Sequence, residues 1–365
     1  MSLRGRVWGV AAGAVGLAAA GTAVGVARRN RQIEDRTEVS PDFGSLHSSP
    51  IIVVAEDGVP LHVEVDEPDP PVEPSSGLKK RLSRRRAEPQ VTVVFAHGYC
   101  LNLDCWHFQR AAYRGLVRTV FYDQRSHGRS GRSSHTNATI EQLGRDLKQV
   151  IDHVVPDGPV VLVGHSMGGM TIIALAEEFP ELFGERVIGV GLVSTTAGGL
   201  DVGKLLLPMF PARLSGTVTH RAVRTLHRGH LAVDNARRIG AAIARVGTDL
   251  FAFGDAVPAG YVDFVDEMLS ATPFEVVAEF FPSFSSLDKF DCVEVLSRIP
   301  TSIICGTADR LTSIGHSRKL NHRIPGSHLL ECEGAGHMVL LERHEQVTAE
   351  LDQLISAATD RVAGR

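Results

Sequence analysis

The segment Gly164–Gly168, which reads G-H-S-M-G, constrains this chain more than any other feature. It follows the apolar run Pro159–Val163 and precedes the helix-favouring run Met170–Ala176. A serine with a glycine two positions away on either side, between a strand and a helix, matches a sharp turn that forces the seryl oxygen outward. Glycine is needed there because a larger side chain would collide with the neighbouring strand or helix. We therefore predict that Ser166 is a nucleophile and that the following helix directs its N-terminus at it.

Two further residues provide the groups that such a serine requires. A serine hydroxyl is a weak nucleophile at neutral pH, so it needs a histidine to accept its proton and a carboxylate to orient that histidine. Asp309 comes directly after the strand-like run Ser302–Cys305, and His337 follows the next such run, His328–Cys332, in a glycine-rich loop. We predict that Asp309 is the orienting acid and that His337 is the base. We expect the side chain of His165 to point away from the nucleophile and reject it as the base.

Backbone N–H groups that stabilise a tetrahedral oxyanion are predicted at two places. Met167, the residue after the nucleophile, supplies one of them. The buried strand Val91–Ala96 leads into His97, Gly98 and Tyr99, where the glycine allows a turn that presents the N–H of Tyr99 as the second donor. His97 is interpreted as a brace of this loop rather than as a reactive group.

With these motifs and the stretch Asp123–Ser130, the chain resembles the α/β-hydrolase superfamily of serine esterases, lipases and cofactor-free haloperoxidase-like enzymes over roughly residues 50 to 358. That stretch is similar to the D-x-R-G-x-G-x-S turn of the family, with Ser126 where a glycine is commoner, and we interpret it as structural. The resemblance implies an α/β-hydrolase fold, with a mostly parallel central sheet, helices on both faces and a helical cap insertion. A serine at position 166 argues against the epoxide and halide chemistry of members with an aspartate nucleophile.

The positions of these motifs predict how the catalytic domain is divided. Residues 50–196 are expected to form the first part of the core, with a flexible charged insertion over 66–90, and residues 291–365 the second part. Residues 197–290 are expected to form the helical cap. Nine of the 15 phenylalanines fall in this segment, and they either line an apolar acyl pocket or form the core of the cap itself.

The N-terminal segment Val7–Ala27 has no charged residue over 21 positions and is flanked by arginines. As a helix it would span about 31 Å, which is enough to cross the core of a bilayer. Residues 1–30 are therefore predicted to be a membrane anchor and residues 31–49 a juxtamembrane linker. Four arginines after the span against two before it favour a cytoplasmic catalytic domain. Export after cleavage of a signal peptide and an Ala/Gly helix outside any membrane are the alternatives.

Composition narrows the possible partners. The net charge of −4 gives no reason to expect nucleic acid. Five cysteines without a C-x-x-C pair indicate neither a zinc site nor a disulfide framework. The sequence shows no cluster of metal ligands and no phosphate-binding glycine loop, so we expect neither a metal nor a cofactor.

The predicted function is a membrane-anchored serine hydrolase that cleaves carboxylic esters, with apolar acyl or lipid esters as substrates, through an acyl-enzyme. Two other classes remain open. The same residues can serve haloperoxidase-like or C–C bond hydrolase chemistry, and a member of this fold can be a non-catalytic membrane scaffold.

Overall fold

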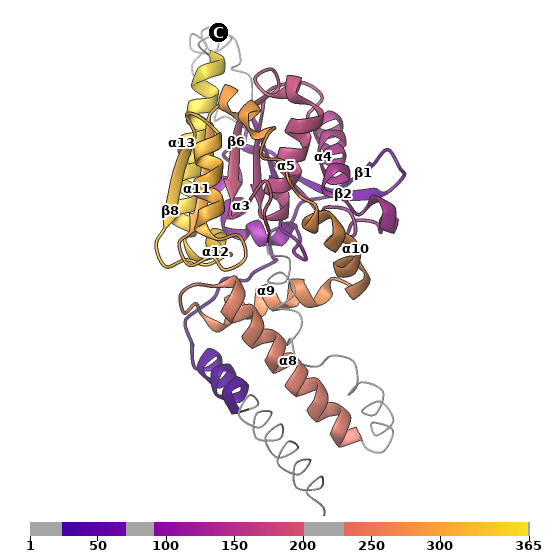
Figure 1. Ribbon diagram of the computed structural model, residues 1–365, viewed down its shortest axis with the longest axis vertical. Helices are drawn as coiled ribbons and strands as arrows, with labels where there is room; N and C mark the ends of the chain where they lie inside the picture. The colour runs from indigo at the N-terminus through magenta and orange to yellow at the C-terminus, as the bar shows by residue number, and fades with distance from the viewer. Residues whose placement is uncertain (1–23, 71–90, 201–229, 364–365) are drawn as a thin grey trace, which may run out of the picture.

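A computed structural model describes residues 24–70, 91–200 and 230–363 of the chain. Within these residues the centre is an eight-stranded sheet with the strand order β1-β2-β4-β3-β5-β6-β7-β8 (Figure 1). The pairs β1–β2 and β2–β4 are antiparallel, and all other neighbours are parallel. The strands are β1 (Pro50–Val54), β2 (Pro60–Asp66), β3 (Thr92–Ala96), β4 (Arg118–Tyr122), β5 (Val160–His165), β6 (Val187–Val193), β7 (Thr301–Gly306) and β8 (His328–Cys332). The predicted α/β-hydrolase fold is confirmed.

The central strands are apolar throughout because both faces of the sheet are covered. Side chains alternate between the faces along a strand. In β3, Val93 and Phe95 belong to one apolar cluster, whereas Val94 and Ala96 belong to the other. A parallel sheet buried on both sides therefore appears in the sequence as a continuous β-branched run.

Helices on each face complete the two clusters. α3 and α13 pack on the face of Val93, and α4, α5 and α11 pack on the face of Val94. The helices of the core are α3 (His107–Tyr113), α4 (Ile140–Val154), α5 (Met167–Glu178), α11 (Ile314–Arg323), α12 (Val339–Glu342) and α13 (His344–Ala363).

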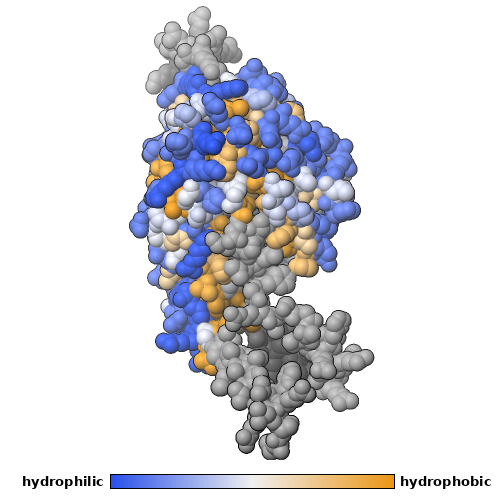
Figure 2. Space-filling model, in the orientation of Figure 1, coloured by the Kyte–Doolittle hydropathy of each residue, from blue (hydrophilic) through white to orange (hydrophobic). Residues whose placement is uncertain are grey.

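Among the described residues, three α-helices lie between β6 and β7 in sequence and gather at one end of the sheet (Figure 1). They are α8 (His230–Ala252), α9 (Ala259–Ala271) and α10 (Phe274–Ser285). Much of the surface around the sheet is hydrophilic, whereas apolar residues gather over the region of α8 and α9 (Figure 2). These helices fall in the segment that the sequence assigns to the cap.

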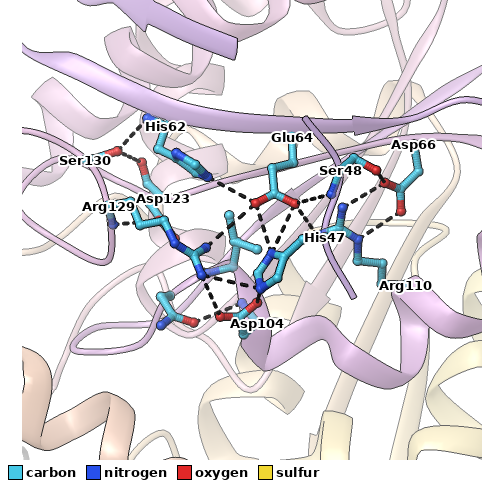
Figure 3. A network of polar contacts seen from close by, with 12 residues as sticks. His47, Ser48, His62, Glu64, Asp66, Asp104, Arg110, Asp123, Arg129 and Ser130 are labelled. Atoms are coloured by element: carbon cyan, nitrogen blue, oxygen red, sulfur yellow. Dashed lines mark hydrogen bonds and ion pairs between the residues drawn. The ribbon is translucent and has the colours of Figure 1, made fainter. Parts of the chain in front are cut away.

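The N-terminal arm, which we define as residues 24–49, packs on both the core and the helices between β6 and β7. Phe43 stacks on Phe264 of α9, with ring centroids 4.4 Å apart. Farther along the arm, the Nδ1 of His47 lies 3.0 Å from Glu64 of β2, and the hydroxyl of Ser48 donates to Asp66 (Figure 3). The arm is therefore joined to two parts of the fold that are distant in sequence.

The prediction of a membrane-anchored protein is wrong. In the part of the chain that the structure describes, no helix has both the length and the apolar character needed to cross a bilayer. Residues 1–23 of the predicted anchor lie outside the described residues. Over 24–34 the chain is helical but carries three arginines, and one of them, Arg29, pairs with Asp249 of α8 at 2.7 Å. Ile33 of the same helix is fully buried.

The segment predicted as a charged insertion over 66–90 begins within ordered structure. Asp66 is the last residue of β2, where its carboxylate binds the buried guanidinium of Arg110 at 2.7 and 2.9 Å. The N–H of Asp69 donates to the carbonyl of Gly115. The basic part of the predicted insertion lies in residues 71–90, outside the described residues.

Candidate active site

Ser166 lies at a tight turn between β5 and α5 and has φ 51° and ψ −114°. Positive φ is unfavourable for a side-chain-bearing residue, so the surrounding chain must hold this conformation. A Cβ on Gly164 would lie 2.4 Å from the carbonyl oxygen of Gly168, and a Cβ on Gly168 would lie 2.1 Å from that of Ala96. Glycine is therefore required at both positions, as expected for a turn that directs the serine out of the sheet.

Asp309 and His337 lie together beyond the ends of β7 and β8. The Nδ1 of His337 is 2.9 Å from Oδ2 of Asp309. Burial opposes the ionisation of Asp309, but His337 and hydrogen bonds from Leu311 and Thr312 outweigh it and lower the pKa of the carboxyl. When Nδ1–H of His337 donates a hydrogen bond to this carboxylate, Nε2 is the ring nitrogen that can accept a proton.

Ser166 and His337 line the same small cavity, which has a volume of about 60 Å³. Its walls are largely apolar and come from the core loops and from the ends of α8 and α9. The apolar lining residues are Leu101, Ala252, Val265, Leu269, Leu311 and Met338. A group bound here would therefore have an apolar environment beside the serine and the histidine.

The loop after β3 forms another wall of this cavity through Gly98 and Tyr99. His97, which precedes them, donates from Nδ1 to the carbonyl of Gly98 at 2.7 Å and accepts at Nε2 from the N–H of Gln124 at 2.9 Å. Complete burial lowers the pKa of His97 to about 3, so the ring is neutral. Met167, the other predicted donor, is the first residue of α5. Both predicted N–H groups thus belong to segments that border the cavity or the serine.

His165 contributes a contact that the sequence did not predict. Its ring lines the cavity and packs 4.8 Å from the ring of His337, and its Nε2 lies 3.0 Å from the carbonyl oxygen of His337. Burial lowers the pKa of His165 to about 3, so the neutral ring donates from Nε2 to that carbonyl. From the sequence we expect the side chain of His165 to point away from the nucleophile, whereas His165 lines the same cavity as Ser166.

Thr312 is a second residue that the sequence analysis missed. Its hydroxyl lies 2.7 Å from the carbonyl oxygen of Ser194, 3.0 Å from Oδ2 of Asp309 and 3.2 Å from Nδ1 of His337. Its N–H also donates to Asp309 at 2.9 Å. The available signal was its position three residues after the predicted acid, within the same turn.

The turn Asp123–Ser130 after β4 has no group in the cavity lining given above and fits a structural role. The carboxylate of Asp123 accepts from the N–H groups of Leu103 and Arg129, both at 2.8 Å. A Cβ on Gly128 would lie 2.3 Å from this carboxylate. Ser126, which stands where a glycine is commoner in the resembling motif, has φ 66°, a conformation that glycine adopts without strain.

The phenylalanines of the predicted cap do not line the cavity. This holds for the eight of the nine that the structure describes, since Phe210 lies outside the described residues. Phe280 and Phe284 of α10 are buried in an apolar cluster, and Phe264 stacks on the N-terminal arm. Phe274 is 59% exposed. The apolar character of the cavity comes from aliphatic side chains and Met338 instead.

The part of the chain that the structure describes contains no group of three or more His, Cys, Asp or Glu side chains that could hold a metal ion. The site brings together a serine at a strained turn, a histidine that shares its cavity, and a buried carboxylate beside Nδ1 of that histidine.

Comparison with known proteins gives the family to which the sequence is similar. The sequence matches the alpha/beta hydrolase family over residues 93–351. It is 28% identical to an uncharacterized protein of Mycobacterium tuberculosis over 274 residues, which cover 70% of this chain and 73% of that protein. It is also 28% identical to the monoacylglycerol lipase of Mycolicibacterium smegmatis over 116 residues, which cover 30% of this chain and 41% of the lipase.

Solved structures share the fold at low sequence identity. A thermophilic esterase from Thermogutta terrifontis superposes with a TM-score of 0.62 at 19% identity, over 86% of this chain and 100% of the esterase. The family match is the stronger finding, because it spans more than half of the chain and includes all the loops that surround the cavity. On this ground the chain belongs to the alpha/beta hydrolase family.

Proposed function

We propose that this chain hydrolyses carboxylic esters through an acyl-enzyme, with Ser166 as nucleophile, His337 as base and Asp309 as orienting acid. The observation that carries the proposal is the 2.9 Å contact between His337 Nδ1 and Asp309 Oδ2, in a histidine that lines one cavity with Ser166. An ionised carboxylate at Nδ1 fixes the tautomer in which Nε2 can accept the serine proton. It also stabilises the imidazolium that forms when the proton moves.

In the proposed reaction, Oγ of Ser166 attacks the ester carbonyl carbon while His337 accepts the seryl proton. The carbonyl oxygen becomes an oxyanion, which the N–H groups of Tyr99 and Met167 stabilise. The tetrahedral intermediate collapses as His337 protonates the departing alcohol. Water then gives a proton to His337 and attacks the acyl carbon, and the carboxylic acid leaves as the serine recovers its proton.

The test of the nucleophile is covalent labelling with a fluorophosphonate probe, together with turnover of p-nitrophenyl butyrate. Ser166→Ala should abolish both while leaving the thermal unfolding curve close to that of the wild type, because the serine contributes a nucleophile and little packing. Ser285→Ala, at an exposed position on α10, is the matched control and should keep both. Labelling that persists in Ser166→Ala would refute the assignment, and labelling without ester turnover would favour one of the other chemistries of this fold.

The proposed substrates are esters of apolar acyl groups. Each buried methylene contributes roughly 0.8 kcal/mol, or up to about fourfold in specificity. A cavity of about 60 Å³ has room for about four to six water-sized groups. We therefore expect kcat/KM for p-nitrophenyl esters to rise from acetyl to hexanoyl and to level off at octanoyl.

Two variants test which side chains hold the acyl group. Leu269→Ala shortens a side chain that lines the cavity and so enlarges the cavity. The acyl chain length with the highest kcat/KM should therefore increase. Phe274→Ala removes an exposed phenylalanine of α10 and should leave the profile unchanged. A series that is flat or falls from acetyl onward would contradict the apolar acyl assignment.

A further inference from the structure

The side chain of Tyr99 connects the loop after β3 to the helices between β6 and β7. Its hydroxyl donates to the carbonyl oxygen of Val277 in α10 at 2.6 Å. Its ring packs edge-on against Phe284 of the same helix, with centroids 4.9 Å apart. Burial raises the pKa of Tyr99 far above its usual range, so the hydroxyl stays protonated and remains a donor. The residue whose N–H is proposed to bind the oxyanion is therefore fixed to α10 by its own side chain.

Cys100, the next residue, is also held by a contact from the helices between β6 and β7. Cys100 has φ 58°, in the left-handed region that a side-chain-bearing residue rarely adopts. Its carbonyl oxygen accepts from the hydroxyl of Thr272, which directly follows α9, at 3.3 Å, and the hydroxyl makes a longer contact of 3.5 Å with Met268. A strained conformation persists only where surrounding contacts enforce it. Here one of those contacts comes from the end of α9.

We propose that the hydroxyls of Tyr99 and Thr272 are positioning groups, which hold the backbone of residues 98–101 in the conformation that aims the Tyr99 N–H at the oxyanion. This inference rests on the proposed ester hydrolysis. It makes oxyanion stabilisation depend on the two hydroxyl contacts that join residues 98–101 to α10 and to the end of α9. The effect is exerted in the transition state, because the N–H binds charge that develops only there.

Tyr99→Phe removes the hydroxyl and keeps the ring. Small displacements of a catalytic group carry large rate penalties, so we expect kcat to fall about tenfold while KM stays within about twofold. Inhibition by a trifluoromethyl ketone, which forms a tetrahedral adduct with the serine, should weaken by about the same factor as kcat. Thr272→Val should likewise lower kcat and weaken inhibition by the ketone with little change in KM, and it serves as the second variant if Tyr99→Phe does not fold.

Glu279→Gln is the matched control. Glu279 lies on α10 two residues from Val277 and pairs with Arg132 of the core at 3.1 Å, so it ties the same helix to the core through a different residue. The control should keep kcat and ketone inhibition at wild-type values. If it loses as much kcat as Tyr99→Phe, general seating of α10 explains the effect and the inference is overturned.

Two further outcomes separate this inference from the proposed function. A wild-type protein that hydrolyses esters and is inhibited by the ketone, with Tyr99→Phe and Thr272→Val both unchanged in kcat, would refute the positioning role alone. A wild-type protein that neither turns over esters nor reacts with a fluorophosphonate would refute the proposed function and this inference with it.

Discussion

Residues with positive φ mark one edge of the sheet. Among the described residues, the four that have positive φ without being glycine are Cys100, Ser126, Ser166 and Ser194. They follow β3, β4, β5 and β6 in turn, and these parallel strands are neighbours in the sheet. Each such residue costs on the order of 1–3 kcal/mol and needs surrounding contacts to hold it. Backbone strain thus gathers where the strands end, which is the edge that carries the candidate site.

Thr312 shows how one side chain connects this strained edge to the proposed triad. Its hydroxyl lies within hydrogen-bond distance of the Ser194 carbonyl, the Asp309 carboxylate and the Nδ1 of His337. Thr312→Val keeps the volume and removes the hydroxyl. A hydrogen bond to a charged group contributes about 1.5–3 kcal/mol. We expect kcat/KM for a p-nitrophenyl ester to fall at least about tenfold.

The conservative variant separates this effect from packing. Thr312→Ser restores the hydroxyl and loses only a methyl group, so it should recover most of the lost activity. The pH profile of kcat/KM should also shift in Thr312→Val, because an acceptor beside Nδ1 of His337 has been removed. Full activity in Thr312→Val with an unchanged pH profile, or a loss in Thr312→Ser as large as that in Thr312→Val, would contradict the role of the hydroxyl.

At the scale of elements, the central strands were predictable because their sequences are short runs rich in β-branched and other apolar residues. The predicted run His328–Cys332 has the same bounds as β8, and the predicted strand Val91–Ala96 begins one residue before β3. The tight turn at Ser166 was predictable from local sterics. Glycine is required at positions 164 and 168 because other atoms lie only 2.1–2.4 Å from where a Cβ would be. Local sterics and burial on both faces therefore leave a clear pattern in the sequence.

Contacts between distant loops leave no such pattern. His165 reaches a carbonyl 172 positions away, at His337, and its ring orientation depends on how two loops are seated rather than on any local spacing. The phenylalanines of α8 to α10 are another case, because apolar composition does not distinguish a cavity wall from a helix core. The apolar N-terminal segment was misread for a related reason: its composition does not reveal that Arg29 and Ile33, just beyond it, pack against the fold.

At the scale of the whole molecule, the N-terminal arm joins the core to the helices between β6 and β7. Two arginines of the arm, Arg29 and Arg36, bind the buried carboxylate of Asp249 on α8 at 2.7 and 2.6 Å. At the other end of the arm, His47 and the N–H of Ser48 contact Glu64 on β2 at 3.0 and 2.9 Å. Both attachments involve a buried carboxylate, and the one at Glu64 should respond to pH.

Glu64 provides a pH-dependent test of this attachment. Burial would raise its pKa, but hydrogen bonds from Ser48, His62 and Arg110 outweigh burial and lower the pKa from 4.5 to about 2 (Figure 3). A carboxyl with a lowered pKa stabilises the fold when ionised. Its contribution is complete above pH 4.5 and is lost as the pH falls toward about 2.

Thermal unfolding of the wild type and Glu64→Gln, measured from pH 7 to pH 3, checks the prediction. Removing one member of a buried ion pair is strongly destabilising, so at pH 7 the variant should melt at least about 5 °C lower. The difference should shrink as the pH falls below 4.5, because Glu64 of the unfolded wild type then takes up a proton that it must release on folding. Glu67→Gln, at an exposed glutamate paired with Arg118, is the control and should parallel the wild type at every pH. A constant gap between wild type and Glu64→Gln across this range would show that ionisation of Glu64 does not hold the arm.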